Sequence, residues 1–360
     1  MSSRSWFGSA LEPWYREHKR PLPWRSTRDP YRIWLSEVML QQTRVDQGLA
    51  YYLRFIERWP TVGDLAAAHE DEVLKEWQGL GYYSRARNLR SAARQVVEEH
   101  GGTFPSSHAE LLRLKGVGDY TAAAIASICF GTPDAVVDGN VYRVLARVFG
   151  IDTPIDSTAG RKRFKALATE LVDPARPGDH NQAVMELGAT VCTPKNPACL
   201  LCPLQPKCVA FKEGRIAGLP VKQGEAKVRD RFFNYLHVPL AQGPYVRQRT
   251  GKDIWQGLFE PPLIESEAPL TRKGLEKALA AAHGSGWQVK EHTPEMKHVL
   301  SHQVIHAVFW TVVPPKGFIP PSDWKPMDHA RHAVPRLIER WLESMGGHAP
   351  AGQQDGVRSA

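Results

Sequence analysis

The chain has no long apolar run and few cysteines. Its 360 residues contain no apolar stretch of the roughly 18 residues that a membrane-spanning helix needs. Residues 1–10 contain no apolar core of a secretory signal peptide, and the five cysteines are too few for a secreted disulfide scaffold of this length. No internal repeat has a solenoid period. These absences argue against a membrane protein, a secreted disulfide scaffold and a repeat protein.

The charge balance of the chain is basic. It has 46 Lys and Arg against 38 Asp and Glu, a formal net charge of +8, and 42% of its residues are hydrophobic. Such a composition supports packed globular domains, and the excess of positive charge favours a polyanionic partner such as nucleic acid. The length predicts two or three domains.

Four of the five cysteines lie together, with the spacing C-x6-C-x2-C-x5-C: Cys192, Cys199, Cys202 and Cys208. Thiolates cluster in this way when they converge on a metal centre. Two disulfides would require an oxidising compartment. A zinc site usually pairs two short knuckles, whereas only Cys199 and Cys202 form one here. The spacing therefore favours a [4Fe–4S] cluster, with zinc as the alternative.

The hydrophobic pattern changes along the chain. Apolar residues recur at helical spacing in 31–59, 111–130 and 141–149, which predicts an all-α domain with many short helices. After the cysteines, alternating and β-branched residues in 232–238 and 304–312 predict strands. Helical patterns return at 271–283 and 332–343.

These changes predict a multidomain protein. We expect an all-α domain over residues 1–213, with the cysteine loop at 192–208, and a polar linker over 214–228. An α+β domain follows over 229–345. The tail, residues 346–360, is rich in Gly, Pro and Gln and is predicted to be disordered.

A glycine-flanked turn stands between two helical segments. Gly116 and Gly118 flank Val117 and allow a tight turn with close backbone approach to a ligand. The free amides at the start of the following helix would suit a DNA phosphate. An ordinary turn between two helices is the alternative interpretation of this segment.

Two carboxylates stand out from their surroundings. Glu37 shares a helix face with Trp34 and Leu40, so it should point inward, where burial raises the pKa of a carboxyl. Asp138 stands at the predicted start of a helix, a position that also suits a plain N-cap. The spacing alone leaves open whether Glu37 is buried or exposed.

The turn, Asp138 some twenty residues later and the cysteines after it together resemble the helix–hairpin–helix DNA glycosylases of the endonuclease III-like branch. Residues 34–43, with 22–25 and 79–85, are similar to the MutY family of adenine DNA glycosylases within that superfamily. The resemblance covers about residues 14–211. It resumes in the C-terminal part, at 255–260 and 300–302.

The resemblance implies a particular reaction. It identifies a base excision repair enzyme that flips adenine out of duplex DNA and hydrolyses its N-glycosidic bond. Glu37 would protonate adenine, and Asp138 would stabilise the sugar cation. Tyr120 and Asn140 would hydrogen-bond these carboxyls. Tyr120 also stands where bifunctional relatives carry a nucleophilic lysine, so no strong lyase activity is expected.

The resemblance also implies the binding residues. The residues expected to line the adenine pocket are Trp24, Arg25, Leu40 and Gln182. Those expected to contact DNA are Gln42, Thr43, Tyr82, the hairpin residues Lys115, Gly116, Val117 and Gly118, and Ser301 with His302, which would read 8-oxoguanine. Trp24, Leu40 and Tyr82 could instead be packing residues. Arg85, Arg87 and Arg90 would follow phosphates or form a solvated helix face.

The expected cofactor is one [4Fe–4S] cluster, with zinc as the alternative. The expected partner is double-stranded DNA that carries adenine opposite 8-oxoguanine or guanine, bound by a monomer without a membrane. The C-terminal domain resembles a Nudix fold but has no Nudix box, so we expect it to recognise 8-oxoguanine without hydrolysing pyrophosphates. The compact N-terminus leads us to expect a bacterial, cytoplasmic protein associated with the nucleoid.

The chain departs from the family's sequence pattern at two positions, and two other functions are alternatives to adenine excision. Lys115 replaces a proline common in the hairpin, and Phe259 replaces a common Trp. A glycosylase–lyase for oxidised pyrimidines would require a lysine at position 120. A DNA clamp without catalysis would leave Glu37 and Asp138 without a role.

Overall fold

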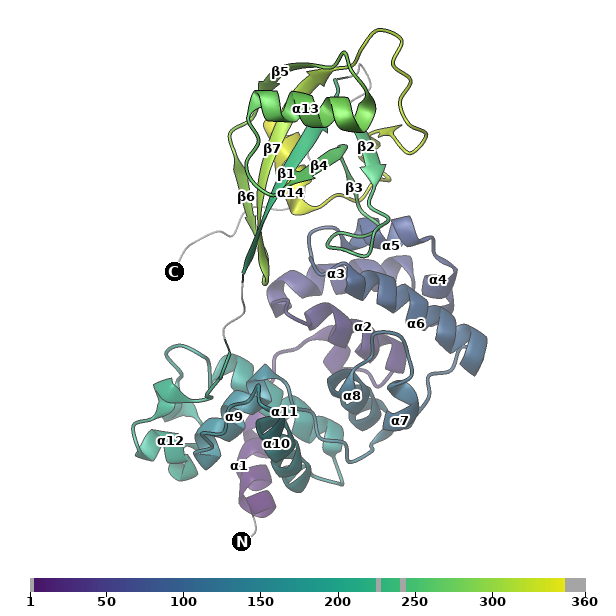
Figure 1. Cartoon of the computed structure of the whole chain (residues 1–360). Coiled ribbons are helices and arrows are strands. Elements are labelled where there is room, and N and C mark those ends of the chain that lie inside the picture. Colours follow the sequence, from purple (N-terminus) through teal and green to yellow (C-terminus); the bar gives the residue numbers. More distant parts are fainter. Residues whose placement is uncertain (1–2, 225–227, 240–243, 347–360) are drawn as a thin grey trace. The chain divides into compact units, whose positions relative to one another are not determined.

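The computed structural model describes residues 3–224, 228–239 and 244–346 (Figure 1). The chain divides into two compact units. The first contains residues 1–68 and 87–225, and the second contains residues 69–86 and 226–360. The second unit thus includes a segment, 69–86, that the predicted boundaries placed in the first domain.

The first unit is built from helices. Its α-helices are α1 (Ser3–His18), α2 (Pro30–Leu40), α3 (Val45–Arg58), α4 (Val62–Ala67), α7 (His108–Leu111), α8 (Asp119–Phe130), α9 (Gly139–Phe149), α10 (Thr158–Leu171), α11 (Pro177–Thr190) and α12 (Val209–Lys212), together with most of α6 (Ser84–His100). Short 3-10 turns are η1 (Pro23–Arg25), η2 (Cys199–Leu201), η3 (Gln205–Lys207) and η4 (Ile216–Gly218). The predicted all-α organisation is confirmed.

Local sequence sets several helix boundaries. Asp29 caps α2, because its side chain accepts a hydrogen bond from the amide of Tyr31, and Pro30 is the first helical residue. The helical pattern over 31–59 is interrupted at Gln42, whose φ is +56°. Most residues avoid this left-handed region, so α2 ends at Leu40 and α3 begins at Val45.

One core cluster joins helices that are far apart in the sequence. Phe7 and Leu11 of α1, Val144 of α9, Phe164 of α10 and Leu187 of α11 are all at most 1% exposed. Leu219, inside the predicted linker, belongs to the same cluster and is 4% exposed. The start of the linker segment is therefore packed against the helices of the first unit.

The hairpin lies where the sequence predicted it. Gly116 has φ +75°, and a Cβ there would come within 2.6 Å of the Asn88 Cβ, so this position requires glycine for both its conformation and its space. Val117 is buried, while Lys115 and Gly118 are exposed. The helix α8 begins directly after Gly118.

The second unit is an α+β structure with two sheets. Its strands are β1 (Arg229–His237), β2 (Tyr245–Gln248), β3 (Phe259–Glu260), β4 (Leu263–Ser266), β5 (Gln288–His292), β6 (Met296–Val299), β7 (Gln303–Val313) and β8 (Lys325–Pro326). The larger sheet has the order β4-β1-β7-β5, with β6 also paired to β7, and the smaller has the order β3-β2-β8. β1 and β7 are parallel, and the other pairings are antiparallel.

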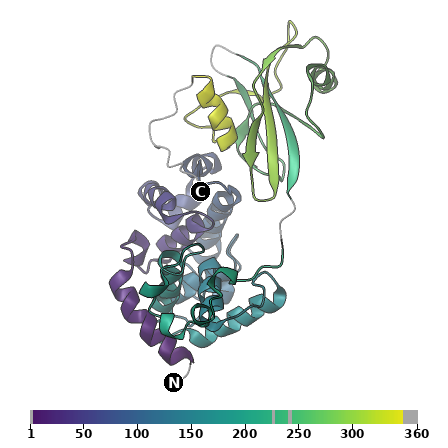
Figure 2. The same cartoon turned by 90° about the vertical axis from the view of Figure 1, so that its left-hand side faces the viewer.

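Two helices lie on opposite faces of the larger sheet (Figure 2). α13 (Arg272–His283) contributes Leu275 and Leu279 to a core cluster with Leu236 and Trp310. On the other face, Trp341 of α14 (Arg336–Ser344) stacks on Phe309, with ring centroids 4.5 Å apart. This unit also contains α5 (Glu70–Trp77) and the first residues of α6.

The predicted strands and the helices of the second unit are confirmed. The strand predicted at 304–312 lies within β7, and the helix predicted at 332–343 begins later, at Arg336, after Pro335. The predicted disordered tail lies outside the described residues except for Gly346. No helix in the described part of the chain has the length and apolar character to cross a membrane.

Candidate active site

Glu37 is a buried carboxyl. It lies on α2 and is 8% exposed, as its place on the apolar helix face predicted. The Tyr120 hydroxyl donates a hydrogen bond of 2.5 Å to its Oε2 atom. Burial raises the pKa of Glu37 to about 7; the bond from Tyr120 opposes this rise and the charge of Asp138 adds to it. Glu37 can therefore hold a proton near neutral pH.

Tyr120 is the second residue of α8, directly after the hairpin. Its hydroxyl also lies 3.5 Å from the sulfur of Met185 on α11. Burial raises the pKa of Tyr120 well above its usual value, and the neighbouring Glu37 and Asp138 raise it further. The phenol thus keeps its proton and acts as a donor to Glu37.

Asp138 occupies the N-cap of α9. Its Oδ1 accepts a hydrogen bond from the Val141 amide at 2.8 Å, and its Oδ2 accepts one from the Asn140 side chain at 2.7 Å. Burial raises the pKa of Asp138, and these hydrogen bonds oppose the rise. The role of helix N-cap and the expected role in catalysis are compatible for Asp138, since its Oδ1 atom caps the helix while its Oδ2 atom faces Asn140.

Arg143 supports this carboxyl indirectly. Its guanidinium donates to Asn140 Oδ1 at 2.8 Å, to the Gly188 carbonyl at 2.8 Å and to the Cys192 carbonyl at 2.6 Å. Arg143 therefore joins Asn140 to the end of α11 and to the first cysteine. The sequence analysis did not single out Arg143, because its position on α9 gives no hint of these distant carbonyls.

A second buried carboxylate, Glu186, also escaped the sequence analysis. Its side chain on α11 is completely buried and pairs with Arg25 at 2.5 Å and Arg20 at 2.7 Å. Burial alone would raise the pKa of Glu186, but the bonds from the two arginines outweigh it and hold the pKa at about 2. The sequence did contain a signal for Glu186, because it is a single carboxylate between the apolar residues Val184 and Leu187. The same kind of signal identified Glu37.

The predicted adenine-pocket residues fall into two groups. Arg25 and Gln182 line the same hollow of about 320 Å³, and Gln182 Oε1 accepts a hydrogen bond from Tyr15 at 3.3 Å. Trp24 is 6% exposed and packs edge-on against Tyr52 at 5.1 Å. Leu40, at the end of α2, is half-buried and packs toward Gly48.

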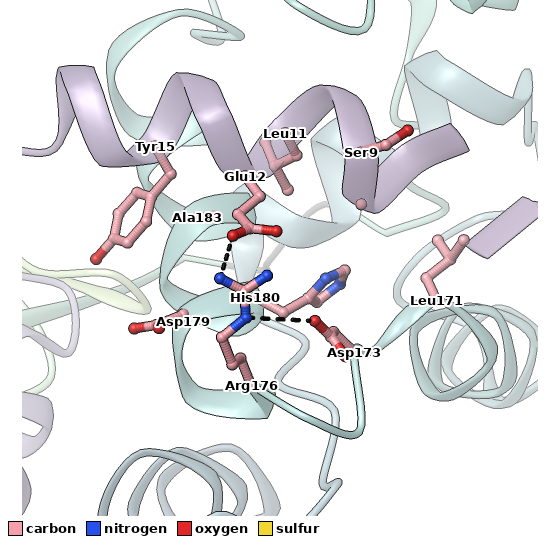
Figure 3. Close-up of a pocket in the computed structure, with 11 residues that line it drawn as sticks. Ser9, Leu11, Glu12, Tyr15, Leu171, Asp173, Arg176, Asp179, His180 and Ala183 are labelled. Atoms are coloured by element: carbon pink, nitrogen blue, oxygen red, sulfur yellow. Dashed lines mark ion pairs between the residues drawn. The ribbon is translucent and has the colours of Figure 1, made fainter. Parts of the chain in front are cut away.

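A further hollow of about 300 Å³ lies between α1 and α11 (Figure 3). Arg176 extends into it and forms ion pairs with Glu12 and, at 3.8 Å, with Asp173. Arg176 is thus already paired within this hollow, and the lining of the hollow includes neither Glu37 nor Asp138. We regard this hollow as a packing feature beside the site.

The turn after α2 presents the next predicted DNA contacts. Gln42 is exposed in a left-handed conformation, and Thr43 beside it is half-buried. The neighbouring Gln41 donates a hydrogen bond of 3.2 Å to Thr121 on α8. This bond ties the turn to the helix that carries Tyr120.

In the second unit, Tyr82 and Ser301 meet. Their hydroxyl oxygens lie 2.6 Å apart, and Tyr82 is 47% exposed. His302 is exposed next to Ser301, in the turn between β6 and β7. The structure thus brings together two predicted DNA-contacting residues that lie 219 positions apart in the chain.

Arg85 differs from the expectation that it follows phosphates on a helix face. Its side chain is buried, with 8% exposure, and it donates to the carbonyls of Leu80 and Gly81 at 3.2 and 3.1 Å. That prediction was wrong for Arg85, because the side chain turns back under its own preceding loop.

The four clustered cysteines line one pocket in the first unit. Its walls also include the apolar side chains of Val144, Leu187 and Val191, and Arg147 Nη1 lies 3.4 Å from Cys192 Sγ. Among the described residues, no group of three or more His, Cys, Asp or Glu side chains is arranged so that it could hold a metal ion. Four thiols around one apolar pocket are nevertheless a donor set that suits an iron–sulfur cluster.

Residues 35–170 match the family described as the HhH-GPD superfamily base excision DNA repair protein. This range includes Glu37, the hairpin, Tyr120 and Asp138. Over 58% of this chain, the structure is similar to the solved structure of a thermostable thymine-DNA glycosylase, with a TM-score of 0.54, 31% identity and coverage of 97% of that chain. The fold and the site therefore place the chain in the class of helix–hairpin–helix base excision DNA repair proteins.

Curated relatives specify the family. The chain is 52% identical over 227 residues to adenine DNA glycosylase of Mus musculus, a match that covers 59% of this chain and 44% of the mouse protein. It is 35% identical over 263 residues to adenine DNA glycosylase of Buchnera aphidicola subsp. Schizaphis graminum, covering 72% of this chain and 76% of the relative. The chain belongs to the adenine DNA glycosylase family, which confirms the resemblance found in the sequence, although it spans less than half the length of the mouse relative.

The pKa of Glu37 can be tested directly. In ¹³C-glutamate-labelled protein, with the signal assigned through Glu37→Gln, we expect its carboxyl to titrate near pH 7. Tyr120→Phe removes a bond that favours the anion, so it should raise this midpoint, whereas Asp138→Asn removes a negative neighbour and should lower it. Tyr245→Phe, in the second unit, is the control. A midpoint near the ordinary glutamate pKa of about 4.3 would contradict this account.

The contact between α11 and Asn140 makes a second prediction. A Cβ on Gly188 would lie 2.6 Å from the Asn140 Cβ and 3.0 Å from its Cα, so Gly188→Ala should push Asn140 and Asp138 out of place. We expect a stability loss of about 1–3 kcal/mol and a loss of about tenfold or more in the single-turnover rate of base excision. Gly139→Ala, whose Cβ meets no atom within 4 Å, is the matched control. A variant as active as the control would refute this positional role.

Proposed function

We propose that the chain removes adenine from duplex DNA in which it is paired with 8-oxoguanine or guanine, as a monofunctional glycosylase. The observation that carries this proposal is the pair of unlike carboxyls. Glu37 has an apolar environment and a phenol donor, whereas Asp138 is held by an amide and the helix N-terminus. The family membership and the adenine DNA glycosylase names of the relatives support adenine as the base.

The reaction follows from these environments. Once adenine is flipped from the stack, protonated Glu37 donates its proton to N7 of the base, and the electrons of the N-glycosidic bond leave with neutral adenine. The sugar becomes an oxocarbenium ion, which ionised Asp138 stabilises. Glu37, now a carboxylate, accepts a proton from the water that attacks the sugar. Tyr120 and Asn140 hold the two carboxyls throughout.

The base and the opposite strand are held by separate groups of residues. We assign Arg25 and Gln182 to the binding of adenine, with Trp24 and Leu40 as packing support. Gln42, Thr43 and the hairpin contact the DNA backbone and the vacated stack. We assign residues 229–345 as the Nudix-like domain that recognises 8-oxoguanine through Ser301 and His302, with Tyr82 stacked beside the lesion.

The absence of an amine nucleophile supports hydrolysis without strand cleavage. A glycosylase–lyase forms a Schiff base between the sugar and a lysine. In this chain, Tyr120 stands in the position that this lysine would occupy. The phenol keeps its proton and cannot form that intermediate. A bifunctional enzyme for oxidised pyrimidines is therefore the less favoured function.

We also propose that Cys192, Cys199, Cys202 and Cys208 hold a [4Fe–4S] cluster. The cluster would supply structural support, not chemistry on the base. Arg147, 3% exposed, lies beside Cys192 and donates to the carbonyls of Thr193 and Pro194 at 2.8 and 3.3 Å. Its buried charge would stabilise the thiolates.

The activity is tested on an end-labelled duplex that carries adenine opposite 8-oxoguanine, with the protein in excess. We expect strand breaks at the adenine only after hot alkali, because hydrolysis leaves an abasic site with an intact backbone. Glu37→Gln and Asp138→Asn should each reduce the excision rate by at least about a hundredfold.

Two results would overturn the proposal. Breaks without alkali would indicate a lyase and a wrong assignment of Tyr120. No excision of adenine by the unaltered protein would instead favour a DNA-binding protein without catalysis, whose carboxyls serve only the fold. A duplex with an oxidised pyrimidine is the control substrate, on which no excision is expected.

The cysteines are tested by composition, independently of activity. Purified protein should contain about four iron atoms and about four acid-labile sulfides per chain. Cys199→Ser should lower both contents. Cys129→Ser, which alters the cysteine of α8 outside the group of four, should leave both contents unchanged. Stoichiometric zinc without sulfide would instead support the alternative metal.

A further inference from the structure

Arg85 is a buried cation inside the loop that presents Tyr82. It is the second residue of α6 and is 8% exposed, while the Tyr82 side chain is 47% exposed. The loop, residues 78–83, joins α5 to α6 and contains Gly79, Leu80, Gly81 and Tyr82. A long cationic side chain usually extends into water, so its burial here calls for an explanation.

The loop has an unfavourable backbone conformation. Gly79 and Gly81 have φ of +100° and +73°, and Tyr82 has φ of +48°. Glycine adopts this region readily, but a tyrosine there is strained. Such a conformation persists only where surrounding contacts stabilise it.

Arg85 contributes several of the contacts that stabilise this turn. Its Nη2 donates to the Leu80 and Gly81 carbonyls at 3.2 and 3.1 Å, and its backbone amide donates to the Tyr82 carbonyl at 2.9 Å. Its guanidinium carbon lies 5.1 Å from the centre of the Trp77 ring and 5.7 Å from that of the Tyr82 ring. One side chain thus holds both the backbone and the ring of the loop.

Trp77 completes this inner support. It is fully buried, and its indole nitrogen donates to the Gly81 carbonyl at 3.0 Å. The Arg85 guanidinium therefore lies among carbonyl oxygens and aromatic faces, the two partners that favour a cation away from water. Burial lowers the pKa of Arg85 to about 10, so the side chain remains charged at neutral pH.

The outer end of Tyr82 is held from a different part of the same unit. Its hydroxyl meets Ser301 at 2.6 Å. At the base of the loop, Gln78 accepts a hydrogen bond from the Val334 amide at 3.2 Å and donates one to Glu339 at 3.1 Å. The loop is thus fixed at its base and its tip, and Arg85 supports the turn between them.

We propose that Arg85 is a positioning residue that holds Tyr82 ready to stack beside the lesion base before DNA binds. The proposal rests on the proposed function, in which Ser301 and His302 recognise 8-oxoguanine and Tyr82 stacks beside the lesion. A preformed loop avoids the cost of ordering Tyr82 at the moment of binding. Arg85 should therefore govern the preference for 8-oxoguanine over guanine and act through Tyr82.

The experiment compares Arg85→Lys, Tyr82→Leu and the double variant. A lysine keeps the charge but cannot reproduce the planar fork that bonds two carbonyls and faces two rings. Single-turnover rates of adenine excision are measured opposite 8-oxoguanine and opposite guanine, with active protein counted from the burst amplitude. Arg94→Lys is the matched control, since Arg94 lies on the same helix, exposed and paired with Glu98 at 2.9 Å.

We expect Arg85→Lys to reduce the ratio of the two rates by about tenfold, the effect of losing one charge-assisted bond. The double variant should have the same ratio as Tyr82→Leu alone, because Arg85 acts through Tyr82. If Arg85→Lys folds poorly, Arg85→Gln, which retains an amide donor, is measured instead, with the same expectation.

The outcomes separate the inference from the function beneath it. If Tyr82→Leu lowers the ratio but the Arg85 variant lowers both rates equally, Arg85 is structural and the inference fails alone. If the ratio of the two rates is much lower in the double variant than in Tyr82→Leu, Arg85 acts elsewhere and the inference also fails. If Tyr82→Leu leaves the ratio unchanged, the role proposed for Tyr82 fails, and the inference fails with it.

Discussion

The hydrogen bond from Tyr120 to the buried Glu37 carboxyl is the interaction on which the site depends. It joins α2 to α8 and offers one donor to a carboxyl that is otherwise removed from water. A carboxyl in this position can release its proton to a base and regain one from water, since neither protonation state is strongly favoured near neutrality. Asp138, by contrast, lies at a helix N-terminus with two donors. The two carboxyls have similar chemistry and different hydrogen-bond partners, and on this difference we base the proposed roles of acid and ionised stabiliser.

The helix α11 supports both halves of this arrangement. Glu186 holds Arg25 and Arg20 on one side, while Gly188 packs directly on Asn140 and its carbonyl accepts from Arg143. Two residues beyond the helix, the Cys192 carbonyl accepts from the same guanidinium. Arg143 thus links the cysteine loop to Asn140, the side chain that donates a hydrogen bond to Asp138. This connection explains in structural terms why a metal centre without chemistry of its own would belong in this domain.

Sequence reasoning succeeded where the cause is local. The helical period turned Glu37 inward, the glycines defined the hairpin, and Asp138 began its helix as a cap. Sequence reasoning failed where distant residues decide. Arg85 was expected to follow phosphates or to lie on a solvated helix face, but the preceding loop folds over it. Glu186 and Arg143 owe their roles to partners 45 to 166 positions away in the chain, which no local pattern reveals. Likewise, only packing assigns residues 69–86 to the second unit.

The most direct test of the central claim is the pH dependence of single-turnover adenine excision by protein in excess over the duplex. If protonated Glu37 is the acid, the rate should fall about tenfold per pH unit above the Glu37 pKa of about 7. Tyr120→Phe should shift that limb to higher pH. A rate independent of pH up to about 9, or a limb that does not move with the Tyr120 substitution, would contradict the account.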